Sequence, residues 1–322
     1  MIGQAENFSI NAIRPAMHID SKQSAAFLAV AEAGSFEQAA VALHLTPSAV
    51  SLRVRALETQ LGQALLVRGR PCRATRSGRQ LMQHLQRARA MERELLADMA
   101  GDGNGEQRAF SAFSLAVNAD SLATWLLPSL VPALQRERIA LELLADDQEH
   151  THALLEAGLV HACIASQAQA MRGCVAEPLG AMRYRLVCSP GFASEWFPRG
   201  ISRASARQAP VVVFNRKDAL QAQVLREAFG LQASSCPCHF VPASEPLLAA
   251  VRCGLGYGMV PELQIQGAVE RGELVDLLPS AAIDVALYWH SWRQQPPRLE
   301  RLARSAMQAA RRVLQPVPGT VP

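Results

Sequence analysis

The sequence predicts an α/β protein in two parts, an all-α N-terminal region and a larger region in which strands and helices alternate. Three observations support this prediction. The first 100 residues carry apolar stripes at helical spacing with capping residues between them, a glycine-rich segment follows, and short β-prone runs then alternate with helical patterns. A chain of 322 residues is too long for one compact core, which fits this division.

Two short helices are expected first. Residues 21–33 have apolar positions at helical spacing, and Gly34 can end that helix. Ser35 can then cap a second helix over residues 36–44, with Gln38 three positions later as its capping-box partner.

A third helix follows a tight turn. Thr46 is a good N-cap and Pro47 suits the first helical position, so the helix is expected to begin there and to end at Gly62. One face carries an apolar stripe that should pack against the first two helices, namely Val50, Val54, Leu57 and Leu61. The opposite face carries Ser48, Ser51, Leu52, Arg53 and Arg55.

A basic hairpin is expected after the third helix. Two short β-prone pieces flank the sequence Gly69-Arg70-Pro71, a pattern typical of a small wing. Nine arginines lie between residues 53 and 89 against one acidic residue, Glu58, although the whole chain has a net charge of only +4. This local positive charge favours a polyanionic partner, and the alternative is a solvated helix face.

A long helix is expected over residues 77–100. Its apolar stripe advances by three and four residues and indicates one side of a helix–helix dimer, interrupted by one acidic residue. The stripe consists of Leu81, Leu85, Ala88, Glu92, Leu95 and Met99.

Three short helices, a tight turn before the third and a basic wing make a winged helix-turn-helix, which places one helix in the major groove of DNA. Small polar residues at the start of that helix can face base edges, while arginines can pair with phosphates or with guanine. Arg68 and Arg70 on the wing can reach the minor groove or the backbone. The candidate contacts to double-stranded DNA are Ser35, Thr46, Pro47, Ser48, Ser51, Arg53, Arg55, Arg68 and Arg70.

From residue 109 onward, strands alternate with helices, a pattern that predicts parallel sheets covered on both faces. We expect two lobes with a ligand cleft between them. Asn118, Asp120 and Ser121 lie where a strand ends and a helix over residues 121–136 begins. Free backbone N–H groups there suit a carboxylate and Asp120 suits an ammonium, so the site fits an α-amino acid; the alternative is that Asp120 or Ser121 only caps the helix.

Further candidate ligand contacts come from both lobes. Ser166 ends a strand, Asn215 and Arg216 follow another strand, and Ser244 and Glu245 open a helix. Glu245 could meet a cationic side chain, although an acidic residue at a helix start more often complements the helix dipole.

The N-terminal region resembles the LysR-type regulators over residues 27–78, FLAVAEAGSFEQAAVALHLTPSAVSLRVRALETQLGQALLVRGRPCRATRSG. The remainder is similar to the ArgP/LysG-like branch of that family, in VNADSLATWLLP at 117–128, VPASEPLLAAVRCGLGYGMVP at 241–261 and LYWH at 287–290. Departures occur at Pro47 and Leu52, where the family usually has polar residues, and at Asn215, where the branch commonly has Asp.

The resemblance implies a transcription factor with a periplasmic-binding-protein-like α/β sensor domain. It further implies that a basic L-amino acid, lysine or arginine, is the effector, that Asp120 contacts its α-amino group, and that the target is an amino-acid exporter gene. A homodimer or homotetramer built from linker-helix dimers is expected, and RNA polymerase is a further candidate partner. The alternatives are a regulator responding to a different amino acid or metabolite, and an architectural or replication-associated DNA-binding protein.

On this basis we divide the chain by function. The expected parts are an extension (1–17), a winged helix-turn-helix (18–76), a linker and dimerisation helix (77–100), a linker (101–108) and an effector-binding domain (109–316), with lobe 1 at 109–183 and 285–316 and lobe 2 at 184–284.

Several function classes are not supported. No apolar run is long enough for a membrane span and no secretory signal is evident, while seven scattered cysteines suggest reduced thiols and a cytoplasmic location. Cys236, Cys238 and His239 could bind a metal, but no second ligand pair stands at zinc spacing. We find no nucleophile–base pair, so neither an enzyme nor a cofactor is predicted.

Overall fold

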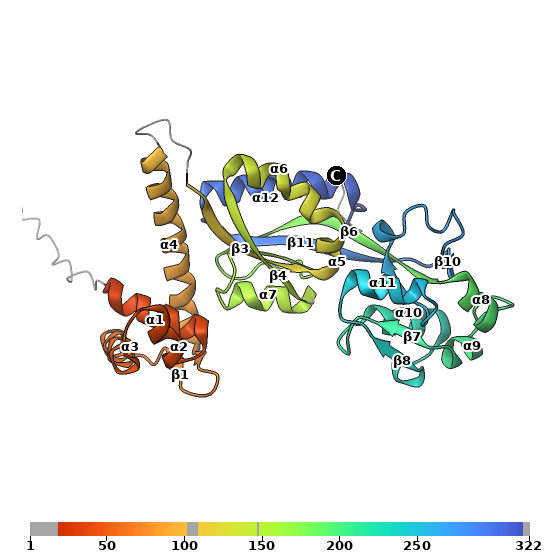
Figure 1. Ribbon diagram of the computed structural model, residues 1–322, viewed down its shortest axis with the longest axis horizontal. Coiled ribbons are helices and arrows are strands. Elements are labelled where there is room, and N and C mark those ends of the chain that lie inside the picture. Colours follow the sequence, from red (N-terminus) through yellow and green to blue (C-terminus); the bar gives the residue numbers. More distant parts are fainter. Residues whose placement is uncertain (1–18, 102–108, 147, 318–322) are drawn as a thin grey trace, which may run out of the picture. The chain divides into compact units, whose positions relative to one another are not determined.

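The computed structural model describes residues 19–101, 109–146 and 148–317 (Figure 1). The chain forms two compact units, residues 1–85 and residues 86–322. The expected extension over residues 1–17 and nearly all of the expected linker over 101–108 lie outside the described residues.

The first unit is the predicted three-helix domain with a wing. Its elements are α1 (Ser21–Ala33), α2 (Phe36–Ala42), α3 (Pro47–Leu61), β1 (Leu66–Val67), β2 (Arg73–Ala74) and the start of α4 (Arg76–Gly101).

The predicted N-caps are present at the starts of α2 and α3. Ser35 accepts a hydrogen bond from the backbone of Gln38, and Thr46 accepts one from the backbone of Ala49 at 3.2 Å. The capping box differs from expectation, because the Ser35 hydroxyl donates to Glu37 at 2.7 Å. Helix α2 also ends two residues earlier than predicted.

The core of the first unit contains the predicted stripe. Val50, Val54 and Leu57 are fully buried, and they belong to the same apolar cluster as residues of α1 and α2. Glu58 on α3 accepts hydrogen bonds from the backbone N–H groups of Leu65 and Leu66, at 2.8 and 3.3 Å. This carboxylate therefore fixes the first wing strand to the end of α3.

The second unit contains, besides the rest of α4, a mixed sheet with flanking helices. Its strands are β3 (Ser111–Asn118), β4 (Ile139–Asp146), β5 (Ala162–Ala165), β6 (Cys174–Cys188), β7 (Val211–Val213), β8 (Cys238–Phe240), β9 (Gly258–Pro261), β10 (Val275–Asp276) and β11 (Ile283–Trp292). Its helices are α5 (Ala119–Ser121), η1 (Leu122–Leu126), α6 (Leu127–Glu137), α7 (Gln148–Glu156), α8 (Pro190–Trp196), α9 (Arg203–Gln208), α10 (Leu220–Phe229), η2 (Ala233–Ser235), α11 (Ser244–Arg252), η3 (Glu262–Gln264) and α12 (Pro297–Val313).

The expectation of purely parallel sheets is wrong. β3 pairs in parallel with β4 and β5, and β7 pairs in parallel with β8, but β11 pairs antiparallel with both β5 and β6. The β6–β11 ladder is long and carries a register shift between Leu287 and Tyr288. β6 also pairs with β9 and β10 at its far end, so this ladder joins the two groups of elements described next.

These two groups form the lobes of the second unit (Figure 1). We call β3, β4, β5, α5, η1, α6, α7 and α12 the first lobe, and β7, β8, β9, α8, α9, α10 and α11 the second lobe. In the first lobe, α6 and α12 cover one face of the sheet and α7 covers the other (Figure 1). The alternation of side chains along β3 explains this: Leu115 and Val117 lie in the cluster that includes α6 and α12, and Ala116 lies in the cluster that includes α7.

The predicted helix over 121–136 exists but starts earlier. Helical structure runs without a break from Ala119 to Glu137, and it contains a π-helical turn over Leu122–Leu126. Such turns are rare and frequently lie at functional sites.

Two further findings concern the described residues as a whole. None of the helices within them is long and apolar enough to cross a membrane. Within the same residues, no group of three or more His, Cys, Asp and Glu is arranged to hold a metal ion, and this includes the Cys236–Cys238 segment.

Gly78 is expected to be essential for the stability of the first unit. A Cβ atom at this position would lie 2.0 Å from the carbonyl oxygen of Leu65, where α4 approaches the wing. We expect Gly78→Ala to reduce the free energy of unfolding by about 1–3 kcal/mol, as overpacked sites do. Chemical denaturation measures this. Gly69→Ala is the control, because its Cβ would meet only the Pro71 carbonyl oxygen at 3.5 Å; equal stability of both variants would contradict the prediction.

Candidate functional site

One face of α3 presents small polar side chains and arginines to solvent. Thr46, Ser48 and Arg55 are exposed, whereas Ser51 and Arg53 are half-buried. The Thr46 and Ser48 hydroxyls lie 3.0 Å apart, so the polar start of the helix is preorganised. Leu52 is also 70% exposed on this helix, which is unusual for a leucine unless something covers it.

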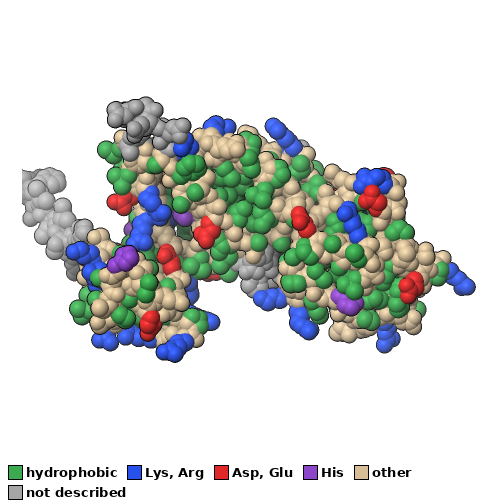
Figure 2. Space-filling model, viewed as in Figure 1, with side chains coloured by type: hydrophobic (Ala, Val, Ile, Leu, Met, Phe, Trp, Pro, Cys, Tyr) green, Lys and Arg blue, Asp and Glu red, His purple; other side chains and the backbone are tan. Residues whose placement is uncertain are grey.

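A groove separates the start of α2 from the wing. It has a volume of about 590 Å³, and its lining includes Ser35, Ser51, Arg68 and Arg70. Arg68 stacks on the Phe36 ring, with its guanidinium carbon 5.5 Å from the ring centre. The groove therefore brings together predicted contacts from the start of α2, from α3 and from the wing. Figure 2 shows basic side chains along the edge of the first unit that holds α3 and the wing.

One carboxylate stands inside this basic surface. Glu37 lines the groove, and the hydrogen bond from Ser35 together with the nearby charge of Arg70 holds the pKa of Glu37 below its usual range. The ionised carboxylate therefore accepts the hydrogen bond that the Ser35 hydroxyl would otherwise donate to a ligand, and its negative charge opposes the approach of phosphate. A narrow helix with small polar side chains, flanked by arginines, is otherwise what a major groove and its phosphates require.

The second unit contains a cleft of about 600 Å³ between its lobes. Most of the described lining is apolar: Ala119, Leu122, Ala123, Leu127, Ala145, Phe214, Pro242, Ala243 and Pro246. The polar lining residues are Asn215, Ser244 and Glu245, all on the second lobe. Such a site suits a small molecule with an apolar stem and a few polar groups.

Asp120 links the two lobes beside this cleft. Its carboxylate accepts one hydrogen bond from the Tyr184 hydroxyl at 2.6 Å and one from the Ser244 hydroxyl at 2.5 Å. Gln264 donates to the Ser244 oxygen at 3.0 Å. Burial raises the pKa of Asp120, and the two hydroxyl donors oppose this effect only in part. Asp120 is therefore a buried acid whose proton state depends on what faces it.

Of the other predicted ligand contacts, two have buried side chains and two have side chains that already contact other groups of the protein. The side chains of Asn118 and Ser121 are buried and are not among the described residues that line the cleft, and no hydrogen bond satisfies their polar atoms in the structure. Asn215 lines the cleft, but its side-chain oxygen accepts hydrogen bonds from the next turn of backbone, at 2.7 and 3.1 Å. Arg216 stacks on Phe240 at 4.6 Å.

Ser166 follows β5 and is not among the described residues that line the cleft. Glu245 opens α11 on the cleft wall, so it is available both to the helix dipole and to a cationic ligand.

Two residues of the site were not predicted. Tyr184 comes from β6, 64 positions from Asp120, and Gln264 comes from the short helix after β9. Tyr184 could have been predicted, because a tyrosine within an apolar strand has a hydroxyl that needs a hydrogen-bond partner. We see no comparable signal for Gln264.

Arg53→Ala is expected to weaken binding to duplex DNA. If Arg53 contacts phosphate, affinity falls for all sequences and the salt dependence becomes shallower by about 1 in slope; if it contacts a base, one position loses specificity. Titration of labelled DNA at several salt concentrations separates these results. Arg226→Ala removes the same charge from an exposed position on α10 and serves as the control. Unchanged affinity of the Arg53 variant would contradict the interface.

Glu37→Gln is expected to strengthen binding to non-specific DNA. Loss of one repelling charge should raise affinity by about twofold, with a larger effect at low salt. Glu32→Gln, at an exposed position on α1, is the matched control for net charge. Weaker binding of all sequences by the Glu37 variant would show that this carboxylate supports the interface instead.

Comparison with known proteins identifies the family of both parts of the chain. Residues 21–79 match the bacterial regulatory helix-turn-helix proteins of the lysR family, and residues 113–311 match the LysR substrate binding domain. The HTH-type transcriptional regulator ArgP of Aeromonas salmonicida is 38% identical over 298 residues, which cover 92% of this chain and 99% of that protein. LysG of Mycobacterium tuberculosis is 38% identical over 292 residues, covering 91% and 94%.

Solved structures give the same result. ArgP from Mycobacterium tuberculosis superposes with a TM-score of 0.80 at 37% identity, covering 93% of this chain and 100% of that one. Full-length LysG from Corynebacterium glutamicum, with bound effector Arg, has a TM-score of 0.73 at 31% identity, covering 92% and 100%. The chain therefore belongs to the LysR family of helix-turn-helix regulators and is an effector-controlled, DNA-binding transcriptional regulator of the ArgP and LysG type, not an enzyme.

Proposed function

We propose that this regulator senses a basic L-amino acid, lysine or arginine, in the cleft between the lobes of its second unit, and that it controls an amino-acid exporter gene. The observation that carries the ligand proposal is the pairing of Asp120, beside the cleft, with Glu245 on the opposite lobe. Two acids at a cleft whose lining is mostly apolar match two cationic groups joined by an aliphatic stem.

Each part of such a ligand has a counterpart. Its α-ammonium would donate to Asp120 in place of the Ser244 hydroxyl. Its carboxylate would accept hydrogen bonds from the backbone N–H groups where the helical run begins at Ala119. Leu122 and Phe214 line the path of the stem. The LysG structure of Corynebacterium glutamicum, which has arginine bound as effector, supports this choice of ligand class.

Calorimetry with free amino acids tests the proposal. We expect arginine or lysine to bind and citrulline, which keeps the length but lacks the side-chain charge, to bind at least about tenfold more weakly. Glu245→Gln should reduce the preference for the charged ligand while leaving α-amino recognition intact. Glu227→Gln, at an exposed position on α10, is the control. Equal affinity for citrulline and arginine in the parent protein would contradict a basic-ligand site.

Effector binding is expected to release a proton in acidic buffer. Burial holds the pKa of Asp120 above its ordinary value of 3.8, so the folded protein retains this proton at pH values where the unfolded chain has lost it. This stabilising contribution is present at low pH and disappears as the pH rises through the raised pKa. An ammonium ligand requires the ionised form, so affinity should increase with pH until that pKa is passed.

Calorimetry in two buffers of different ionisation enthalpy counts the released proton. Asp120→Asn should abolish both the release and most of the affinity. Binding without proton release at any acidic pH, with normal affinity, would show that the ligand does not contact this carboxylate.

We further propose a homodimer, or a tetramer of such dimers, that binds through the exposed stripe of α4. Leu95 and Met99 are 60% and 67% exposed, which is costly for apolar side chains in a single chain. Solution mass measurement tests this assembly. RNA polymerase is proposed as a partner of the DNA-bound protein in the cytoplasm, and no cofactor besides the effector is invoked.

A further inference from the structure

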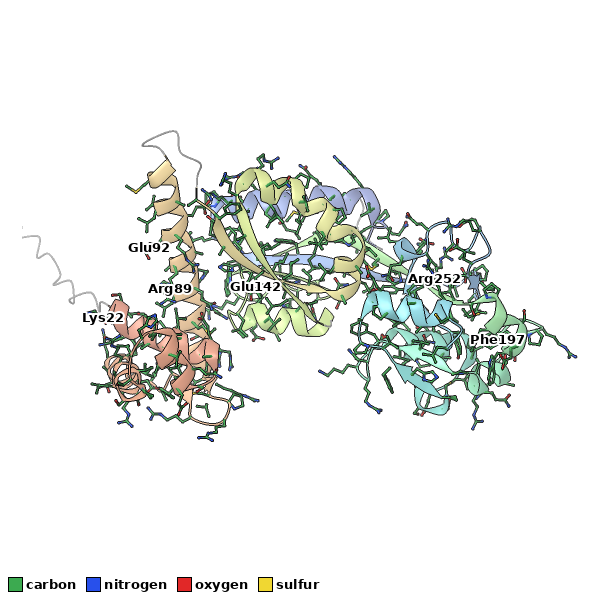
Figure 3. The ribbon with its side chains drawn as sticks, in the orientation of Figure 1. Lys22, Arg89, Glu92, Glu142, Phe197 and Arg252 are labelled. Atoms are coloured by element: carbon green, nitrogen blue, oxygen red, sulfur yellow. The ribbon has the colours of Figure 1, made fainter. Side chains whose placement is uncertain are left out.

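The second half of α4 has two different faces. Arg87, Ala90 and Glu94 are three and four residues apart and so share one face, on which Ala90 and Glu94 are each only 4% exposed. The other side of the helix carries exposed Met91 and Leu95. Figure 3 shows Glu92 on the side of α4 that is turned away from β3. One face of this half-helix is therefore docked within the second unit, and the other is open.

Glu94 makes the most specific of the docking contacts. Its Oε1 atom accepts a hydrogen bond of 2.8 Å from the backbone N–H of Arg298, in the first turn of α12. Helix α12 is preceded by Pro296, whose side chain cannot cap it. The first N–H groups of a helix need acceptors, and a carboxylate there also complements the helix dipole. Glu94 thus supplies from α4 the cap that α12 lacks in its own sequence.

Two further contacts hold the same face. The Arg87 guanidinium carbon lies 4.5 Å from the ring centre of Trp292, the last residue of β11. Ala90 belongs to the same apolar cluster as Leu299 of α12. The Arg298 side chain, 1% exposed, donates to the Ala109 carbonyl and the Ser111 hydroxyl at the start of β3, which fixes the end of α12 that Glu94 caps.

These contacts connect α4 to the β6–β11 ladder, which reaches Asp120 through Tyr184. Trp292 is one end of β11, and the other end, Ile283, is paired with Tyr184 of β6. The Tyr184 hydroxyl donates a hydrogen bond to Asp120. At its opposite end, α4 is part of the first unit, where Met82 is buried in the core with α3. A single helix therefore contacts both the DNA-binding core and the strand ladder of the sensor.

We infer that Glu94 and Arg87 are positioning residues that couple effector occupancy to DNA binding. This inference rests on the proposed effector function. An effector that displaces the Ser244 hydroxyl from Asp120 changes the hydrogen bonding that Asp120 shares with Tyr184 of β6, and the β6–β11 ladder, Trp292 and the α12 cap pass that change to α4. Coupling of this kind is a free energy between two sites, and it requires that both sites bias the same element.

The test measures DNA affinity with and without saturating L-arginine or L-lysine in the full-length protein. For the parent we expect a change of about 5–150-fold, the usual range of allosteric coupling. In Glu94→Gln, which keeps the shape and loses the charge, the ratio should fall below about threefold, while the effector Kd and the DNA Kd without effector stay within about threefold of the parent values. Arg87→Ala should act in the same direction without altering the cap.

Glu300→Gln is the matched control. It removes a carboxylate from the same first turn of α12, at an exposed position, and should leave the ratio unchanged. If both the Glu94 and Arg87 variants respond to effector as the parent does, and only their melting temperatures fall, the contacts are structural and the inference is wrong. A parent protein whose DNA affinity does not respond to either amino acid would contradict the proposed effector as well, so the two failures are distinguishable. If Glu94→Gln does not fold, the Arg87 variant decides alone.

Discussion

A carboxylate that is wholly or partly removed from water must find hydrogen-bond donors, and this constraint organises the protein at three places. Glu58 joins α3 to the wing through backbone N–H groups, Asp120 joins the two lobes through hydroxyls, and Glu94 joins α4 to α12. In each case the donors belong to a different element from the acid. A buried charge with few possible partners specifies one arrangement of those elements, whereas apolar packing alone tolerates several.

The DNA surface obeys the opposite rule, since its charges are left in water for a partner to neutralise. Arginines from α3 and the wing lie near short hydroxyl side chains, and in an interface of this kind phosphates supply affinity while the few groups that reach bases supply selectivity. Glu37 is the exception within this surface. A regulator that must leave non-specific DNA benefits from such a group, because the repulsion applies at every sequence while the specific contacts apply at one.

Local sequence patterns predicted the first unit almost completely. Caps at Ser35 and Thr46 and the apolar stripe of α3 are short-range signals, and each lies where the pattern indicated. The sheet was less predictable. A run of buried residues has the same sequence pattern in a parallel and in an antiparallel strand. In addition, β6 contains Pro178 and Gly180, which are typical of a turn although they lie within the strand. Gly180 has φ of +138° beside Leu314, a close approach that only the fold reveals. Tyr184 was missed for the same reason, because its partner is distant in sequence.

If Asp120 contacts the effector as proposed, its hydrogen bonds to Tyr184 and Ser244 allow a response to ligand without a large change in contacts. Without effector, Asp120 already accepts hydrogen bonds from Tyr184 and Ser244, so under the proposed function an ammonium gains only the difference between a charged donor and the neutral Ser244 hydroxyl that it displaces. That difference, and not the full interaction, sets both the affinity and the shift between conformations. Ser244 belongs to the second lobe and Tyr184 to β6, which joins the lobes, so releasing the Ser244 hydroxyl alters how the lobes are held. A site that begins unsatisfied would bind more tightly, but it would have no hydrogen bond between its lobes to exchange, and binding would then change the contacts of α4 less.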